Sequence, residues 1–235
     1  MGTESTITRA PLLGEPLAVE LMNTIWADRA GVHDSLGTPA EAAGWLRAAG
    51  HRLAMELPGA DELTVELADR VLRQLRRLRD ALRELAAEAT EATEATEATE
   101  ATEATEATGF RSMAARQAAI AVVNRASALA PAWPELHWPD ACAPVRSLRT
   151  RGTPAELAVS TLARHGVELI AGPTRSRLRA CRAPGCVLYY LQDHPRRAWC
   201  SAGCGNRARV ARHYRRHRRA AAAREVGRDQ GGERP

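Results

Sequence analysis

Apolar side chains recur at spacings of three and four residues along much of the chain, which is the pattern of amphipathic helices. The clearest run follows Asp61 and has its apolar positions at Leu67, Val71, Leu75, Leu78, Leu82 and Leu85. Six arginines lie off this stripe, at Arg70, Arg73, Arg76, Arg77, Arg79 and Arg83. Because four acidic side chains (Glu66, Asp69, Asp80 and Glu84) lie among them, we interpret this surface as a solvated face and not as a nucleic-acid site.

Two tetrapeptides carry the same helix-start signature, Thr38-Pro39-Ala40-Glu41 and Thr153-Pro154-Ala155-Glu156. In each, Thr can serve as N-cap, Pro takes the first helical position, and Glu can close a capping box. Helices are therefore expected from residue 39 to about Gly50, and from residue 154 to the helix-ending pair Gly172-Pro173.

Shorter patterns predict the remaining elements. Residues 16–26 and residues 114–130 are expected to form helices. Between the second of these and the helix at 154, residues 135–138 and 145–149 are candidate strands of a small hairpin, separated by prolines that indicate a turn. Cys142 lies alone in that turn, and no Cys-His signature accompanies it, so a catalytic nucleophile is not expected there.

Residues 88–108 are seven Glu-Ala-Thr triplets. A period of three matches neither the 3.6-residue repeat of a helix nor the alternation of a strand, so it cannot keep one face on a core. The carboxylates of Glu side chains three residues apart also repel one another, and Thr is a poor helix former. We expect an acidic, solvated spacer with frayed helix at most.

Composition favours a mostly α fold. The chain has 235 residues, 45% of them hydrophobic, with aromatics at only 4%. Its apolar residues are chiefly Ala, Leu and Val, a helix-favouring mixture. No stretch approaches the roughly 18 apolar residues of a membrane span, and the first residues lack a signal-peptide pattern, so we expect a cytoplasmic protein without a membrane partner.

The charge of +5 is unevenly distributed. Residues 175–235 carry 16 arginines and four acidic residues, a net charge of +12, whereas residues 1–174 carry 17 arginines and 24 acidic residues, a net charge of −7. A strongly basic end beside an acidic body indicates that this end meets a polyanion.

Four of the five cysteines form a C-x4-C, x13, C-x3-C array made of Cys181, Cys186, Cys200 and Cys204. Four thiolates in two close pairs complete the tetrahedral shell of a structural Zn²⁺ ion, whereas a catalytic site would leave one position open. A disulfide framework is not expected in the cytosol. Because residues 175–220 hold few apolar side chains, the metal should supply folding energy.

Around this array we expect the elements of a treble-clef zinc finger in their usual order: a cysteine turn, a hairpin and a helix that carries the last two ligands. The segments 187–192 and 196–199 would pair as a hairpin, and a helix would then bring Cys200 and Cys204 to one face. From Gly205 to about Gly227 one basic helix is expected. On it Arg209, Arg212, Arg216 and Arg219 share a face flanked by Arg215, and Val210, Tyr214 and His217 lie on the other side, available to pack on the finger.

The run WCSAGCGNRAR at residues 199–209 resembles the hallmark of the CGNR zinc-finger family, and the match extends through His213 to Arg216. The runs LAVELMNT at 17–24 and TPAE at 38–41, with Trp45 and Leu46, are similar to the ABATE domain that accompanies it. The resemblance implies a stress-induced bacterial transcription regulator whose Cys181, Cys186, Cys200 and Cys204 hold zinc.

Together these observations predict a helical ABATE-like domain over 1–174, a CGNR-type zinc finger with a basic helix over 175–222, and a disordered tail over 223–235. The expected function is that of a transcription regulator that binds duplex DNA and is not an enzyme. The expected DNA contacts are Asn206, Arg207, Arg209, Arg212, Arg215, Arg216 and Arg219. A homodimer and an unidentified small-molecule effector at the N-terminal domain are further possibilities.

Three alternatives stay open. The basic helix could serve an RNA-binding module, although Tyr189, Tyr190, Tyr214 and Trp199 are interpreted as packing residues and not as stacking platforms. The zinc module could be a scaffold for a protein partner. An enzyme would need a pocket around Asn23, Trp26 and Asp28, where no catalytic motif is found.

Overall fold

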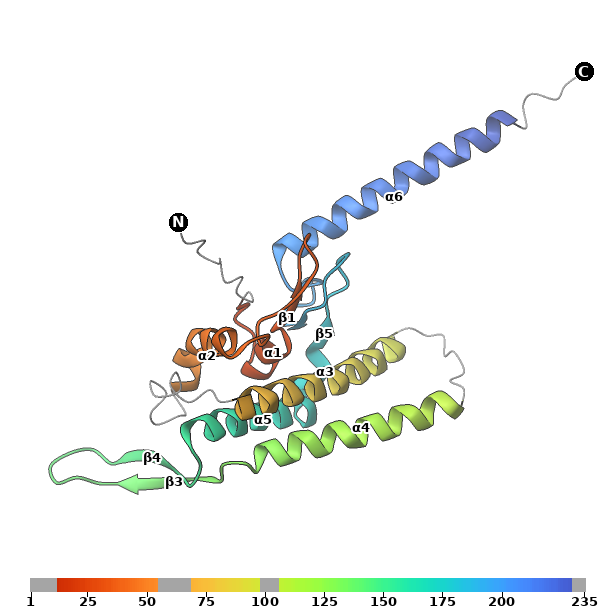
Figure 1. Ribbon diagram of the computed structural model, residues 1–235. Coiled ribbons are helices and arrows are strands. Elements are labelled where there is room, and N and C mark those ends of the chain that lie inside the picture. Colours follow the sequence, from red (N-terminus) through yellow and green to blue (C-terminus); the bar gives the residue numbers. More distant parts are fainter. Residues whose placement is uncertain (1–11, 55–68, 98–105, 230–235) are drawn as a thin grey trace, which may run out of the picture.

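The computed structural model describes residues 12–54, 69–97 and 106–229, and within them helices dominate (Figure 1). Three long helices pack against one another: α3 (Asp69–Glu97), α4 (Glu106–Ser127) and α5 (Pro154–Ala171). Short two-stranded sheets are attached to this helical body. The expected mostly α fold is therefore confirmed. No helix in the described ranges is long and apolar enough to cross a membrane.

The apolar stripe predicted for α3 faces the core. Leu75, Leu78 and Leu82 are fully buried between α3 and its neighbours. Helix α5 approaches α3 closely because it has a glycine at the contact: a Cβ atom at Gly166 would lie 2.5 Å from Leu82 Cδ2. The core therefore depends on close packing between α3 and α5.

Helix α1 (Leu17–Met22) is buried along its whole length against α5 and α3. The expected helix over residues 16–26 is wrong in its second half, because the chain leaves the helix at Asn23 and forms a hairpin of β1 (Ile25–Ala27) and β2 (Val32–Asp34). The Thr24 hydroxyl donates to the Leu21 carbonyl, which satisfies an acceptor at the helix end. Trp26 lies in β1, where its ring stacks on His33.

Both predicted helix starts are observed. Helix α5 begins with a complete capping box, in which Thr153 and Glu156 exchange side-chain-to-backbone hydrogen bonds, and it ends before Gly172 as expected. Helix α2 (Pro39–Ala54) begins after Thr38, whose Oγ1 accepts from the Glu41 amide at 3.2 Å. It continues four residues past Gly50.

The Glu-Ala-Thr tract is more ordered than expected at its start. Helix α3 extends through residue 97, and α4 begins at residue 106, while residues 98–105 lie outside the described part of the chain. Thr90 is buried and donates to the Ala86 carbonyl, and Glu88 pairs with Arg116 of α4. The solvated-spacer prediction is wrong for these first triplets, because packing against α4 outweighs their low helix propensity.

The predicted hairpin is confirmed as β3 (Ala132–His137) and β4 (Val145–Thr150), paired antiparallel over six residues. It projects from one end of the helical body (Figure 1). Several large apolar side chains on it are exposed, including Trp138 at 72%. Cys142 is exposed in its connecting loop.

The C-terminal part consists of a short 3-10 turn, η2 (Pro173–Arg177), the strands β5 (Leu178–Ala180) and β6 (Tyr189–Leu191), and the helix α6 (Ala202–Asp229). The expected pairing of residues 187–192 with 196–199 is wrong, because β6 pairs with β5, which precedes the first cysteine. The chain after β6 forms a turn instead, in which the Arg197 amide donates to the His194 carbonyl. Helix α6 leads away from the body (Figure 1).

Replacing Thr153 with Ala removes the hydroxyl that accepts from the Glu156 amide in the capping box of α5, whereas the bond from the residue 153 amide to Glu156 Oε2 can still form. We expect a loss of about 1 kcal/mol in the free energy of unfolding, measured by urea denaturation, because an amide of the first turn loses its acceptor. Thr153→Ser keeps the hydroxyl and should retain most of the stability. Equal stability of the Ala and Ser variants would contradict this role.

Candidate zinc site and basic helix

The four cysteines of the predicted array meet at one point. Their sulfur atoms all lie within 4.8 Å of one another, although two come from the β5–β6 loop, one from the segment just before α6 and one from the first turn of α6. The Cys186 and Cys200 sulfurs are 3.8 Å apart, and the Cys200 and Cys204 sulfurs 3.4 Å. A tetrahedral zinc site with Zn–S bonds of about 2.3 Å has sulfur–sulfur edges of about 3.8 Å. The donor set and its spacing fit a Zn²⁺ ion.

Local sequence shapes each half of this site. In the first half Gly185 has a left-handed backbone (φ +71°) that glycine adopts readily, and the Cys186 amide donates to the Ala183 carbonyl at 2.9 Å. In the second half the Ser201 hydroxyl accepts from the Cys204 amide at 3.3 Å and caps α6. Each cysteine pair is therefore held by a tight local turn.

Without a cation the four closely spaced thiols cannot all ionise readily, because a thiolate at one position raises the pKa of its neighbours. Hydrogen bonds from Cys186 and Cys200 lower the pKa of Cys181 to about 2, whereas the contact with Cys181 raises the pKa of Cys186 to about 11 and also raises that of Cys200. One sulfur can carry negative charge while its neighbours keep their protons. A divalent cation at the centre removes this conflict, because it stabilises all four thiolates together.

Two further residues of the CGNR run support the site. Arg207 Nη2 donates to Cys204 Sγ at 2.9 Å, and this bond raises the pKa of Arg207. A Cβ atom on Gly205 would lie 3.0 Å from Trp199 Cδ1, so glycine allows the indole to approach the helix start. From the sequence Arg207 is expected only as a DNA contact, whereas in the structure its guanidinium group donates to a zinc ligand.

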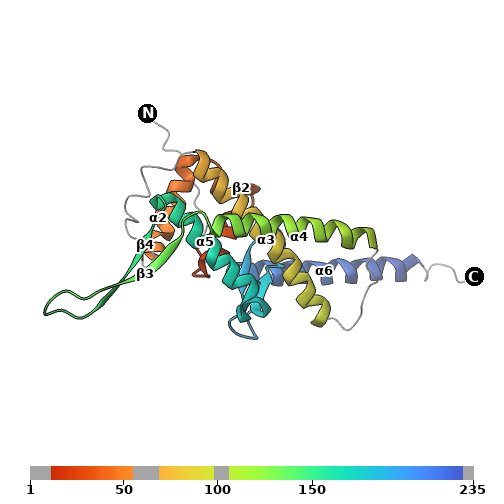
Figure 2. The ribbon, with the colours of Figure 1, turned by 90° about the horizontal axis from the view of Figure 1, so that it is seen from below.

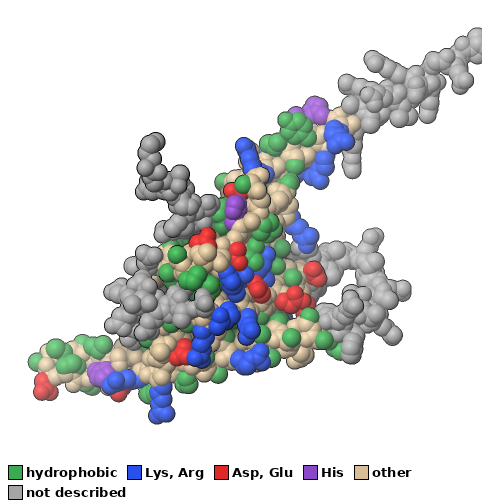
Figure 3. Space-filling view, in the orientation of Figure 1, with side chains coloured by type: hydrophobic (Ala, Val, Ile, Leu, Met, Phe, Trp, Pro, Cys, Tyr) green, Lys and Arg blue, Asp and Glu red, His purple; other side chains and the backbone are tan. Residues whose placement is uncertain are grey.

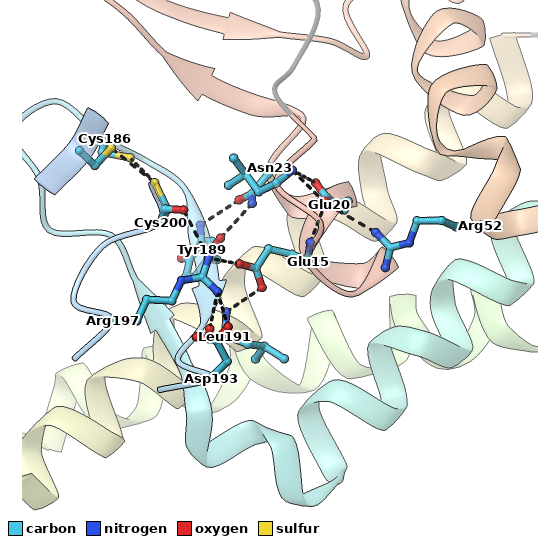
Figure 4. Close-up of polar contacts among 12 residues, drawn as sticks. Glu15, Glu20, Asn23, Arg52, Cys186, Tyr189, Leu191, Asp193, Arg197 and Cys200 are labelled. Atoms are coloured by element: carbon cyan, nitrogen blue, oxygen red, sulfur yellow. Dashed lines mark hydrogen bonds and ion pairs between the residues drawn. The ribbon is translucent and has the colours of Figure 1, made fainter. Parts of the chain in front are cut away.

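The finger is attached to the helical body through backbone hydrogen bonds of β6. Asn23 at the end of α1 accepts from the Tyr189 amide at 2.8 Å and donates to the Tyr189 carbonyl at 2.9 Å, and both bonds are buried (Figure 4). Glu15 accepts from the Leu191 amide at 2.9 Å. These side chains satisfy backbone groups on β6 as a neighbouring strand would.

An ion-pair network continues from this edge to the zinc site. Arg197 pairs with the buried carboxylate of Glu15 and donates to the carbonyls of Leu191 and Cys200 (Figure 4). Glu15 is itself positioned by Glu20, which accepts from the Glu15 amide at 2.8 Å. Burial raises the pKa of the Glu20 carboxyl. A continuous set of polar contacts therefore links α1 to the backbone of a zinc ligand.

Part of the arginine surface on α3 is structural. Arg83 donates to the carbonyls of Met22 and Val187 at 2.8 and 3.1 Å, and its burial lowers the pKa of the guanidinium. Arg79 is only 4% exposed and pairs with Asp34 and Asp80. The solvated-face interpretation is therefore wrong for these two arginines. The sequence carries no sign of this, because most of their carbonyl and carboxylate partners come from distant segments.

The residues considered for an enzyme pocket have structural partners instead. Asn23 binds β6, Trp26 Nε1 donates to Ser35 Oγ at 3.2 Å, and Asp28 accepts from the Ala30 amide at 2.7 Å. His33 also pairs with Asp28, and this hydrogen bond lowers the pKa of the Asp28 carboxyl. The Asn23 side chain therefore attaches β6 to the body, whereas those of Trp26 and Asp28 stabilise the segment around β1 and β2.

The basic helix α6 is largely solvent-exposed over its described side chains. Arg209, Arg212, Arg215 and Arg216 all lie on the surface, as does Arg218, which the sequence analysis did not single out. No acidic residue occurs between residues 202 and 224. Asn206 is exposed and accepts from Arg209 Nη1 at 3.3 Å. The side chain of Arg219 lies outside the described residues. Figure 3 shows arginine side chains along this projecting helix.

The expected packing side of α6 is not observed. Val210 is 46% and Tyr214 66% exposed, and the His213 and His217 rings contact each other at the surface, with their Nε2 atoms 3.0 Å apart. Burial on α6 is concentrated near its start, at Cys204 and Ala208. The packing prediction is wrong because burial against the finger ends near Ala208, before Val210, Tyr214 and His217.

The fold and the four-cysteine site together define a zinc-finger protein with a helical N-terminal region. Residues 15–173 match the model of the ABATE family, described as a "Putative stress-induced transcription regulator", and residues 177–217 match the CGNR zinc finger. The ABATE match covers more than half of the chain, so the chain belongs to the ABATE family and carries a CGNR zinc finger. No curated protein matches it. The two family descriptions are of a regulator and a zinc finger and not of enzymes.

Replacing Cys186 with Ser removes one of the four zinc ligands. Bound zinc should fall from about one ion per chain to near zero, measured by elemental analysis, because metal binding and folding of the finger are coupled. Cys142→Ser is the matched control, since this thiol is exposed in the β3–β4 loop. Equal zinc loss in the control, or full zinc retention in Cys186→Ser, would contradict the assignment.

Replacing Asn23 with Ala leaves the Tyr189 amide and carbonyl buried without their partner. We expect a loss of roughly 2 to 4 kcal/mol in the free energy of unfolding of the zinc-loaded protein, because two buried polar groups lose hydrogen bonds. Asn124→Ala, on the exposed surface of α4, should cost far less. Similar chemical denaturation midpoints for the two variants would argue against this docking role.

Proposed function

We propose that this protein is a DNA-binding transcription regulator whose α6 helix enters the major groove of duplex DNA. The observation that carries the proposal is a projecting helix with surface arginines at Arg209, Arg212, Arg215 and Arg216 and no acidic residue in its sequence before Glu225. A single α-helix fits the major groove, which is about 12 Å wide. The description of the ABATE family as a "Putative stress-induced transcription regulator" supports this role, and the compartment proposed with it is the bacterial cytoplasm.

The proposed contacts fall into two groups. The surface arginines of α6, together with Arg219, bind phosphates or guanine edges, since guanidinium groups suit both. Asn206 and Arg207 lie near the helix start, where Arg207 has one N–H engaged by Cys204 and other donors remaining for a phosphate. Arg207 would then join the zinc site directly to the nucleic acid.

Zinc would act by fixing the direction of the helix. Cys200 and Cys204 flank the start of α6, and the other two ligands come from the β5–β6 hairpin that is docked on the body. Loss of the metal would release the helix from this hairpin, and ordering it on DNA would then cost more conformational entropy. DNA affinity should therefore depend on zinc, although the four cysteines are not among the proposed DNA contacts.

One observation favours a second candidate, an RNA-binding module. The Tyr214 ring is exposed and lies edge-on to His213, with the ring centroids 6.1 Å apart, so it is accessible to an unpaired base. The interpretation of Tyr214 as a packing residue is wrong, because its side chain is exposed. Single-stranded RNA readers use such aromatic platforms.

Binding to a labelled random DNA duplex, measured by fluorescence anisotropy, should weaken steeply with salt. If about five phosphates are neutralised, log K should fall with log salt at a slope of about −4 to −5. Arg212→Gln and Arg216→Gln should each reduce the slope by about 1. Arg146→Gln, an exposed arginine of β4, serves as the control and should leave it unchanged.

The same assay separates the competing functions. A zinc chelator should lower duplex affinity, and salt-independent or chelator-insensitive binding would contradict the proposed interface. Preference for single-stranded RNA over duplex DNA, lost in Tyr214→Leu, would favour the RNA module. Absence of binding to either nucleic acid would leave the zinc module as a scaffold for a protein partner.

A further inference from the structure

A pocket of about 260 Å³ lies among the three long helices of the N-terminal region. Its walls come from α3, α4 with the residues that follow it, and α5, which lie side by side in both views (Figures 1 and 2). The apolar wall is formed by Val122, Ala126, Leu129 and Val159. This site is separate from the zinc ligands and from the arginines of α6.

The polar lining of the pocket is basic and lacks acidic side chains. Arg77 of α3 and Arg125 of α4 line it, and neither forms an ion pair with an acidic side chain among the described residues. Other arginines nearby are paired: Arg79 with Asp34, and Arg116 with Glu88. Both side chains are exposed, so an anion in the pocket would meet positive charge from two neighbouring helices at its rim.

A third lining residue has unsatisfied hydrogen-bonding capacity. The Oε1 atom of Gln74 is buried and has no hydrogen-bond partner among the described residues. Buried polar atoms without partners are rare in folded proteins, since each costs free energy. Gln74 lies one helical turn from Arg77 on α3. The unpartnered Oε1 is an acceptor, so turning the Gln74 amide by about 180° would present its NH2 donor to a carboxylate held by that arginine.

The size of the pocket limits the ligand. A volume of about 260 Å³ is below the range of about 300–1,000 Å³ that holds drug-sized molecules, whereas benzene occupies an engineered cavity of about 150 Å³. The pocket therefore has room for one small ring or branched chain together with a charged group. Inorganic phosphate would satisfy the arginines and leave the apolar wall without contacts.

From this combination we infer that the pocket among α3, α4 and α5 binds a small organic carboxylate with an aromatic or branched apolar body. Arg77 and Arg125 hold the carboxylate, since guanidinium and carboxylate groups form paired hydrogen bonds. Val122, Leu129 and Val159 cover the apolar body. This gives the N-terminal region a ligand site of its own, independent of whether α6 binds DNA or RNA.

The test is a titration of the full-length, zinc-loaded protein with benzoate, followed by methyl NMR signals of Val122, Leu129 and Val159. Benzoate should shift these signals saturably below about 10 mM. Arg77→Gln and Arg125→Gln should each weaken binding by about tenfold or more, because a charge-assisted hydrogen bond is lost. Arg73→Gln, an exposed arginine one turn earlier on α3 and outside the pocket, is the matched control and should leave the affinity unchanged.

Two further probes, benzyl alcohol and inorganic phosphate, distinguish a carboxylate site from an unspecific apolar void and from a general anion patch. Benzyl alcohol has the same ring without the charge and should bind much more weakly than benzoate, and inorganic phosphate should not displace benzoate at equal concentration. Equal binding of benzyl alcohol would show an unspecific apolar void, and efficient displacement by phosphate would show a general anion patch. Either result, an absence of saturable shifts, or an equal effect of Arg73→Gln would overturn the inference.

Discussion

The structure depends on hydrogen bonds to the backbone groups of β6 that do not pair with β5. One edge of this short strand pairs with β5, and the other faces the helical body, where the described residues provide no strand. Asn23 and Glu15 take the place of a strand and bind the amides and carbonyl that would otherwise be buried without partners. The zinc finger is therefore held by directional hydrogen bonds that restrict its orientation on the body.

This attachment joins the finger and the helical body into a single packed unit. The buried core continues from Leu21 and Leu162 of the body to Leu178, Tyr189 and the zinc-binding cysteines. Metal binding and core packing then support each other, because unfolding the finger would expose some of the body's buried surface. The zinc ligands fix the local conformation of the finger. The polar contacts of Arg197 and Arg83 fix the position of the finger on the helical body.

The same arrangement keeps opposite charges apart. Residues 1–174 carry a net charge of −7 and residues 175–235 a net charge of +12, so a basic helix folded onto the body would be neutralised. Helix α6 instead leaves the body soon after Cys204 (Figure 1), and its arginines stay at the surface. Helix α3 connects the separate regions, since it carries Arg77 at the pocket and Arg83 at the finger.

The sequence alone was sufficient for features that depend on neighbours close in the chain. The capping box at Thr153, the stripe on α3 and the cysteine spacing were all predicted, because helical periodicity, capping and ligand turns involve residues a few positions apart. Tertiary structure decided the pairing of β5 with β6, the helical start of the Glu-Ala-Thr tract, the burial of Arg79 and the carbonyl contacts of Arg83. It also decided the role of Asn23, whose partner Tyr189 lies 166 residues away. Such contacts join segments that only the packed core brings together, so no local pattern records them.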